Sequence, residues 1–161
     1  MRTNQDLLEC DLRGQTRVLK RLVQGASLEE VLHTLVDVAE ESRPDMIASV
    51  LLVDRKTGCL RNGSSRKIPE HYCRIIEGTM PDPNAGSCGT AAFTGKRVIV
   101  EDISTDPLWA RDREIAMDAG FHACWSEPII SCLSVAGTAH VWAVQNLDFP
   151  PLGSCSSPSS C

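Results

Sequence analysis

The sequence predicts an α+β fold in which helices pack on a central antiparallel β-sheet. Three observations support this class. Two amphipathic helical stretches come first, within residues 3–42. Strand-like apolar runs and short helical segments then follow, separated by turns that contain Pro, Gly or Asp. Residues 46–53 and 59–65 are joined by a short turn, so we expect them to pair as an antiparallel hairpin.

Apolar spacing and a capping motif predict the two N-terminal helices. Residues 3–23 carry an interrupted apolar stripe, with Gly14 as a weak point. Ser27 and Glu30 have the spacing of a capping box, which starts the second helix, and Pro44 ends that helix. The stripe of the first helix consists of Leu7, Leu8, Leu12, Leu19, Leu22 and Val23.

The hairpin and a short helix make up the next part of the chain. Residues 46–53 are nearly all apolar, which predicts a central strand covered on both faces. Residues 59–65 predict the returning strand. Pro69 opens a short helix that ends before Gly78, and residues 80–85 contain two prolines and predict a loop.

The stretch from Gly86 to Ile130 carries its own start and stop signals. We expect Ser87 to cap a short helix that ends at Gly95, where a positive φ costs glycine little. Residues 97–103 contain a run of β-branched residues and predict a strand with a buried centre.

A second helix and a last clear strand complete this stretch. Asp106 is the expected N-cap, Pro107 takes the first helical position, and the helix continues to Gly120. Residues 121–129 then alternate in character, as a strand does. One face carries Phe121, Ala123, Trp125 and Ile129, and the other carries His122, Cys124 and Ser126.

Four motifs follow one another in this stretch: GSCGTAA at Gly86–Ala92, VIVEDI at Val98–Ile103, DPLWA at Asp106–Ala110, and ACWSEPI at Ala123–Ile129. In this order and spacing they resemble the GAF domain family. The closer resemblance is to GAF modules of bacterial multidomain sensors, such as sensor histidine kinases and diguanylate cyclases. It covers roughly residues 19–130, and it implies a central antiparallel sheet with terminal helices on one face and a small-molecule pocket on the other.

Composition and charge restrict the function classes. The chain has 161 residues, enough for one domain with a core, and its net charge of −5 argues against a nucleic-acid-binding surface. No apolar run approaches the roughly 20 residues that span a bilayer, and the N-terminus lacks a signal-peptide pattern. We therefore expect a cytoplasmic protein with no membrane span and no nucleic-acid partner.

The chain contains eight cysteines but no C-x-x-C pair, so the usual spacing of zinc and redox motifs is missing. Without a sign of secretion, free thiols are expected, several of them buried. The eight are Cys10, Cys59, Cys73, Cys88, Cys124, Cys132, Cys155 and Cys161.

Candidate ligand-binding residues follow from these patterns and from the resemblance. Cys88 lies at a predicted helix N-terminus, where the helix dipole lowers a thiol pKa. Cys124 lies on the strand expected to line the pocket. The Trp109 indole can stack on a planar ligand, or it can fasten the crossing helix to the sheet. The candidates are Trp109, Cys124, Ser126, Cys88, Thr90 and His122; we expect no metal site and no catalytic residue, and the cofactor is left unknown.

An enzyme is the main alternative from another class. Free methionine-R-sulfoxide reductases are GAF proteins with a cysteine in a similar G-x-C-G-T setting. They have another cysteine about ten residues earlier, whereas here the nearest preceding one is Cys73. Their H-I-A-C-D-S-A-S block is replaced by residues 122–126. The cyclic-nucleotide signature N-K-x-F-x-D-E and a phytochrome-like bilin context are also missing, and a haem would depend on His122 alone.

The resemblance implies a sensory module that binds an unknown small molecule and biases a kinase or cyclase output domain in its longer relatives. The first helix is a candidate seam for a homodimer, and a pure dimerisation module is a further alternative. We divide the chain into a helix and linker (1–25), a GAF-like domain (26–144) and a disordered Ser/Pro/Cys-rich tail (145–161). The resemblance fades after Ile130, so a truncated fragment with a tail translated out of frame is a hypothesis left open.

Overall fold

The computed structural model describes residues 4–43, 45–131 and 134–143. Its strands are β1 (Met46–Val53), β2 (Leu60–Ser65), β3 (Val98–Val100), β4 (Ala123–Ser131) and β5 (Ser134–Ala143). Its helices are α1 (Asn4–Val23), α2 (Leu28–Ser42), α3 (Glu70–Ile76), α4 (Gly86–Thr94), the 3₁₀ helix η1 (Pro107–Trp109) and α5 (Arg113–Asp118). The predicted tail from residue 145 lies outside the described residues.

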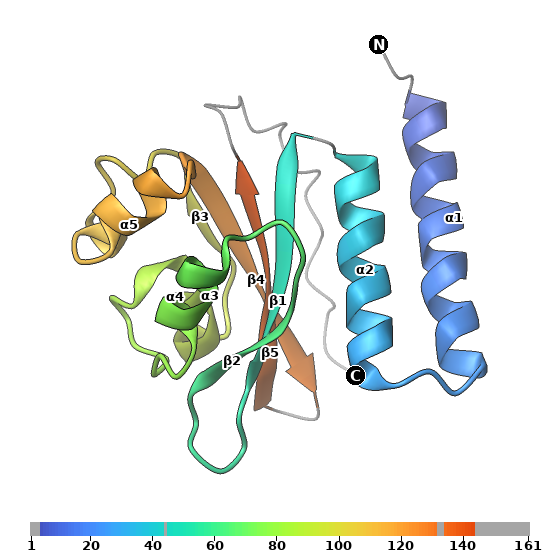
Figure 1. Ribbon diagram of the computed structural model, residues 1–161, viewed down its shortest axis with the longest axis horizontal. Coiled ribbons are helices and arrows are strands. Elements are labelled where there is room, and N and C mark those ends of the chain that lie inside the picture. The colour runs from blue at the N-terminus through green and yellow to red at the C-terminus, as the bar shows by residue number, and fades with distance from the viewer. Residues whose placement is uncertain (1–3, 44, 132–133, 144–161) are drawn as a thin grey trace, which may run out of the picture.

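The described strands form one antiparallel sheet in the order β2-β1-β5-β4-β3. Figure 1 shows α1 and α2 on one side of this sheet, and α3, α4 and α5 on the other. The predicted α+β architecture is therefore confirmed. None of the described helices has the length and apolar character needed to cross a bilayer.

The capping box at the start of α2 is confirmed. The backbone N–H of Ser27 donates to the Glu30 carboxylate at 2.8 Å, and the Glu30 N–H donates to the Ser27 hydroxyl at 3.3 Å. The predicted weak point in α1 has a packing role. A Cβ on Gly14 would lie 2.2 Å from Cγ1 of Val38 in α2. The missing side chain thus lets the two helices approach closely.

Strand β5 lies at the centre of the sheet, beyond the last strand that the sequence pattern clearly predicted. It pairs with β1 from Met46 to Leu52 and with β4 along that strand's whole length. A Cβ on Gly137 would lie 2.2 Å from the Leu51 carbonyl oxygen, so only glycine fits this close approach. The sheet therefore continues beyond Ile130, where the resemblance was expected to fade.

The region before β4 differs from the predicted long strand and single crossing helix. Strand β3 has three residues, because Asp102 starts a turn in which its carboxylate accepts hydrogen bonds from the N–H and hydroxyl of Ser104. The expected buried centre is wrong as well, since Ile99 is 45% exposed. The crossing helix is split into η1 and α5. The Arg113 guanidinium reaches back across the break and donates to the carbonyls of Ile103 and Asp106.

Each face of the sheet has its own apolar cluster. On the α2 side, Leu32, Val36, Ala48 and Val50 pack together. On the α4 side the cluster is larger and includes an edge-to-face pair, with the Tyr72 and Phe121 ring centroids 5.3 Å apart. Its buried members are Ile68, Tyr72, Val100, Ile103, Trp109, Ala116, Phe121 and Cys124.

Candidate functional site

A small cavity lies on the α4 side of the molecule, with a volume of about 50 Å³. Its walls come from five segments: the start of β2, helix α3, the loop between α3 and α4, the first turn of α4, and the region around η1 and α5. The lining residues are Leu60, Tyr72, Ile75, Ile76, Thr79, Ala85, Gly86, Ser87, Cys88, Gly89, Trp109, Arg111, Asp112 and Ile115. Segments far apart in the sequence therefore meet at one place.

The first turn of α4 brings Ser87 beside β4. The expectation that Ser87 caps this helix is wrong, because the N-cap position is Ala85, which makes no side-chain capping bond. The Ser87 hydroxyl is completely buried and lies 3.2 Å from the Cys124 sulfur. Gly86 adopts φ +59, and the Trp109 ring lies 3.6 Å from the position its Cβ would occupy. A larger residue would be strained at Gly86.

The two candidate thiols are buried, with Cys88 7% and Cys124 0% exposed. Burial raises the pKa of the Cys88 thiol to about 12, although a hydrogen bond from Ser126 opposes this shift. Burial also raises the pKa of Cys124. The expected lowering of the Cys88 pKa by the helix dipole is therefore wrong, because desolvation of a thiolate outweighs the dipole.

Trp109 belongs both to the cavity wall and to the core. Its side chain is 4% exposed, and it lines the cavity beside Gly86. The Asp106 carboxylate accepts the Leu108 N–H at 2.8 Å and so starts the short helix that holds Trp109. The two interpretations of Trp109 from sequence, a ligand contact and a packing residue, are compatible in this position.

The candidates Ser126, Thr90 and His122 do not line the cavity. Ser126 is completely buried and contacts Cys88 from β4, behind the cavity wall. The Thr90 hydroxyl donates to the Pro83 carbonyl at 3.0 Å and so fixes the loop that precedes α4. His122 is half-buried and precedes β4, where its carbonyl accepts the Ile103 N–H. Of the six, Cys88 and Trp109 line the cavity directly, and ligand binding by any of them stays a prediction.

Sequence reasoning missed the contribution of α3 and the loop that follows it. Tyr72, Ile76 and Thr79 line the cavity, and Tyr72 is 3% exposed. The one signal in the sequence was an aromatic residue in a short helix of otherwise mixed character. Its partner Phe121 lies 49 positions later, so their contact depends on the tertiary fold.

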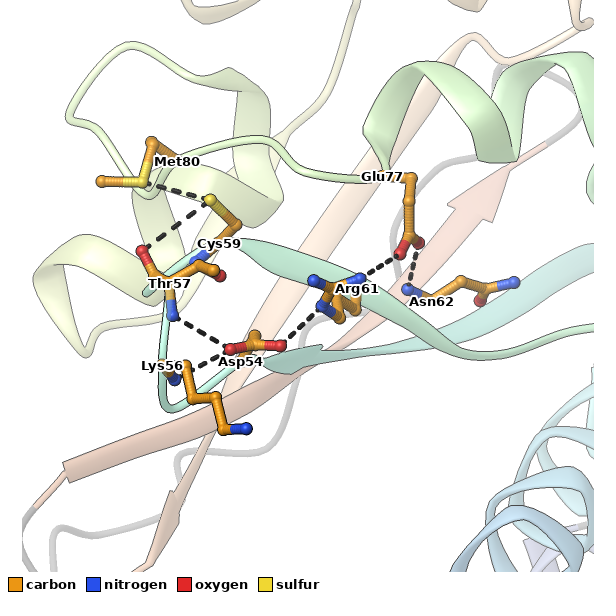
Figure 2. Close-up of polar contacts among 8 residues, drawn as sticks. All are labelled: Asp54, Lys56, Thr57, Cys59, Arg61, Asn62, Glu77 and Met80. Atoms are coloured by element: carbon orange, nitrogen blue, oxygen red, sulfur yellow. Dashed lines mark hydrogen bonds and ion pairs between the residues drawn. The ribbon is translucent and has the colours of Figure 1, made fainter.

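The loop after α3 is fastened to the free edge of β2. Leu60 donates its N–H to the Thr79 carbonyl and accepts the Gly78 N–H, both at 2.8 Å. Figure 2 shows the Glu77 carboxylate accepting the backbone N–H of Asn62 at 2.8 Å and contacting Arg61. These bonds satisfy donors that an edge strand would otherwise leave open, and they hold one wall of the cavity in place.

The same network continues into the β1–β2 turn. Asp54 accepts the backbone N–H groups of Thr57 and Lys56, and the Arg61 Nε donates to it at 2.7 Å (Figure 2). These three donors, with Thr57 first, lower the pKa of Asp54 to about 2. The turn is therefore held by a carboxylate that stays charged at neutral pH.

The family model of the GAF domain matches residues 25–151. The chain belongs to the GAF domain family. The match continues beyond Ile130 and includes β5, in agreement with the central position of that strand. Helix α1 precedes the matched region.

A curated relative of this GAF domain is the "Methyl sulfide methyltransferase-associated sensor" of Methanosarcina acetivorans. The two are 47% identical over 118 residues, which is 73% of this chain and 12% of the relative. The chain thus spans a small part of the length of a sensor protein, and it is homologous to that part.

Solved GAF structures share the fold. One is the GAF domain of a phosphoenolpyruvate-protein phosphotransferase from Coxiella burnetii, with a TM-score of 0.71 and 16% identity over 92% of this chain and 84% of that one. Another is a domain of a putative two-component sensor histidine kinase from Sinorhizobium meliloti, with a TM-score of 0.60 and 21% identity over 78% of each chain. At these identities the similarity shows the fold alone.

The described part of this GAF domain holds no group of three or more His, Cys, Asp or Glu side chains arranged to bind a metal ion. The cavity instead offers apolar side chains, one indole, the hydroxyl-bearing residues Tyr72, Thr79 and Ser87, a neutral thiol and the paired Arg111 and Asp112. Such a set suits non-covalent binding of a small molecule.

Proposed function

We propose that this GAF domain is the ligand-sensing module of a larger signal-transduction protein, and that the α4-side cavity receives the ligand. The observation that carries the proposal is the placement of Trp109 and Cys88 around one cavity on that side of the sheet. A ligand there would shift α4 and η1 against the sheet and so change the packing of the terminal helices. A kinase or cyclase output domain and a cytoplasmic location are part of this proposal.

A variant that fills the cavity tests this function. Ala85 lines the cavity, whereas Ala110 is exposed and lies outside the lining. A small-molecule library of mixed size and charge should include compounds that shift the NMR signal of the Trp109 indole in the wild type and in Ala110→Leu. The same compounds should have no effect in Ala85→Leu. A library without any compound that shifts this signal, or equal shifts in both variants, would contradict the proposal.

The relative's description links it to a methyl sulfide methyltransferase. We extend this association to the present chain as a proposal, on the basis of the 47% identity over the shared domain. Dimethyl sulfide is accordingly the first compound to test in the library. A bacterial origin and a truncated gene stay predictions.

The homodimer predicted from the first helix also belongs to this proposal. Four leucines on α1 are more than half exposed and follow one another at heptad spacing: Leu8, Leu12, Leu19 and Leu22. If they form the seam, Leu12→Glu should convert a dimer into a monomer in analytical ultracentrifugation, while Arg13→Glu, at an exposed position outside the leucine stripe, should not. A wild-type monomer at high concentration would reject the seam.

The reductase alternative depends on Cys88 or Cys124 acting as a nucleophile. Burial raises the pKa of both thiols, which disfavours the reactive thiolate. Turnover of free methionine sulfoxide with a thiol reductant, lost in Cys88→Ala, would nevertheless establish the enzyme.

A further inference from the structure

The size of the α4-side cavity restricts what it can hold. Its volume is about 50 Å³. A water molecule needs about 10–15 Å³ on this measure, and an apolar cavity of about 150 Å³ binds benzene with its six carbons. By proportion, the present cavity has room for roughly two to four non-hydrogen atoms. Cyclic nucleotides and tetrapyrroles are far larger than this.

The charge of the lining restricts the ligand further. Among the lining residues, Arg111 and Asp112 carry charge, and they pair with each other at 3.3 Å. The Arg111 side chain is 77% exposed and that of Asp112 is 29% exposed, so the pair extends from the mouth of the cavity to its partly buried wall. An ion inside the cavity would have to compete with this existing pair for its counter-charge, and burial of an ion that stays unpaired is costly.

The interior polar groups already contact one another. The Ser87 hydroxyl lies 3.2 Å from the Cys124 sulfur, and Ser126 hydrogen-bonds with Cys88. The Thr79 carbonyl accepts the Leu60 N–H at 2.8 Å. The remaining lining is largely aliphatic and aromatic. A ligand therefore meets apolar surface and weakly polar neutral groups.

We propose that this cavity selects an uncharged molecule of about two to four non-hydrogen atoms and excludes ions of the same size. The inference rests on the proposed function, because it names the class of ligand for the same site. It predicts weak binding, since the ceiling on ligand efficiency limits the Kd of a four-atom ligand to roughly tens of micromolar at best.

Four planar molecules of one shape test this selection: acetone, acetamide, acetate and acetamidinium. Each has four non-hydrogen atoms, and the first two are neutral while the last two carry opposite charges. NMR titration of the full chain, up to about 100 mM of each compound, should show at least about tenfold tighter binding of both neutral compounds than of either ion. The shifts should include the Ser87 amide and the Trp109 indole, and Ala85→Leu should abolish them while Ala110→Leu should not.

A substitution that adds a positive charge to the cavity lining gives a second test, because it should change the preference between acetone and acetate. Ile75 lines the cavity and is 44% exposed, so a lysine at this position can keep its ammonium near water. Ile75→Lys should strengthen acetate binding relative to acetone by about tenfold. The same substitution at the exposed Phe93 of α4, outside the lining, should leave the ratio unchanged.

The results distinguish this inference from the function on which it rests. Binding of acetate or acetamidinium at least as tight as that of acetone, or no binding of any of the four, would overturn the inference. If the library experiment instead finds that a larger or charged compound shifts the Trp109 signal and that Ala85→Leu abolishes the effect, the sensing function stands and the selection fails.

Discussion

The two faces of the sheet differ in how completely the helices cover them. On the α4 side, Trp109, Phe121 and Cys124 are at most 4% exposed, and the space between the elements is a cavity of about 50 Å³. On the other side, a groove of about 720 Å³ lies between α1, α2 and the sheet, and Leu35 and Trp125 are among the residues that line it.

The proposed sensing site is the smaller of these two spaces. The groove is larger, but it lies open between the two helices and the sheet, and Leu35 in its wall is 38% exposed. The cavity is smaller, but hydrogen bonds and buried rings fix its walls from five segments. A small site with fixed walls can discriminate between ligands, whereas a wide apolar groove is suited to another polypeptide surface.

The largest expected effect is on the free energy of unfolding. It is seen by comparing two substitutions, one of a tryptophan on each face of the sheet. Trp109→Ala should lower the free energy of unfolding by about 3–5 kcal/mol, because it removes a buried indole and leaves a void. Trp125→Ala should cost clearly less, because Trp125 is half-buried and lines the open groove. Urea denaturation of both variants measures the difference. Equal losses would show that the two faces are packed alike.

The reactivity of the cysteines gives a second comparison, between the buried thiols of the cavity side and the half-buried thiols elsewhere. A rise of the Cys88 pKa from 9.0 to about 12 lowers its thiolate fraction at neutral pH by a factor of about 1000. Iodoacetamide should therefore modify Cys10 and Cys59, which are half-buried, long before Cys88 and Cys124. Peptide mapping by mass spectrometry reads out each site. Rapid labelling of Cys88 in the folded chain would show that the cavity is open.

The buried Cys88 thiol predicts how the stability of the fold changes at alkaline pH. The folded-state pKa of Cys88 is raised, so between pH 9 and about 12 the unfolded chain loses the thiol proton while the folded chain keeps it. Stability should fall as pH rises through this window, and Cys88→Ala should reduce the fall.

A smaller effect is expected where the loop after α3 is fastened to β2. Glu77→Gln weakens the contacts with Arg61 and with the Asn62 N–H, so amide exchange at Asn62 and Gly78 should accelerate by up to about tenfold. Glu70→Gln is the matched control, because Glu70 is an exposed residue at the other end of α3 and its ion pair with Arg74 spans 3.9 Å. Identical exchange in both variants would argue against Glu77 as an anchor of the cavity wall.

The smallest effect is expected at the β1–β2 turn in acid. Backbone N–H groups of Thr57 and Lys56, and then Arg61, lower the pKa of Asp54 from 3.8 to about 2. A lowered folded-state pKa means that the contribution of Asp54 is fully present above pH 3.8 and is lost as pH falls through about 2. Asp54→Asn should flatten this part of the stability curve slightly. If stability depends on pH in the same way in Asp54→Asn and in the wild type, the lowered pKa of Asp54 is contradicted.

The elements that sequence predicted well are those with local signals. The Ser27–Glu30 capping box, the hairpin of β1 and β2, and the end of α4 at Gly95 each depend on residues a few positions apart. The central strand β5 was indicated only weakly, because its pattern around Val135 and Gly137 is rich in small residues. Its position depends on pairing with two strands, and Gly137 is explained by its contact with Leu51 and not by its neighbours in sequence.

The site was predicted less completely, for a related reason. Trp109 and Cys88 were found because each belongs to a recognisable motif, and both line the cavity. The pKa of Cys88 was predicted with the wrong sign, since the sequence shows the helix start but not the depth of burial. Tyr72 and Thr79 were missed because the fold alone brings α3 to this cavity.

The central claim is that a ligand binds on the α4 side and not in the groove. Hydrogen exchange mass spectrometry of the full chain, with and without saturating acetone, tests it most directly. The account predicts slower exchange in residues 79–89 and 109–115, which contain cavity-lining residues, and no change in residues 35–43, which contain groove-lining residues. Slower exchange confined to residues 35–43 would contradict the account.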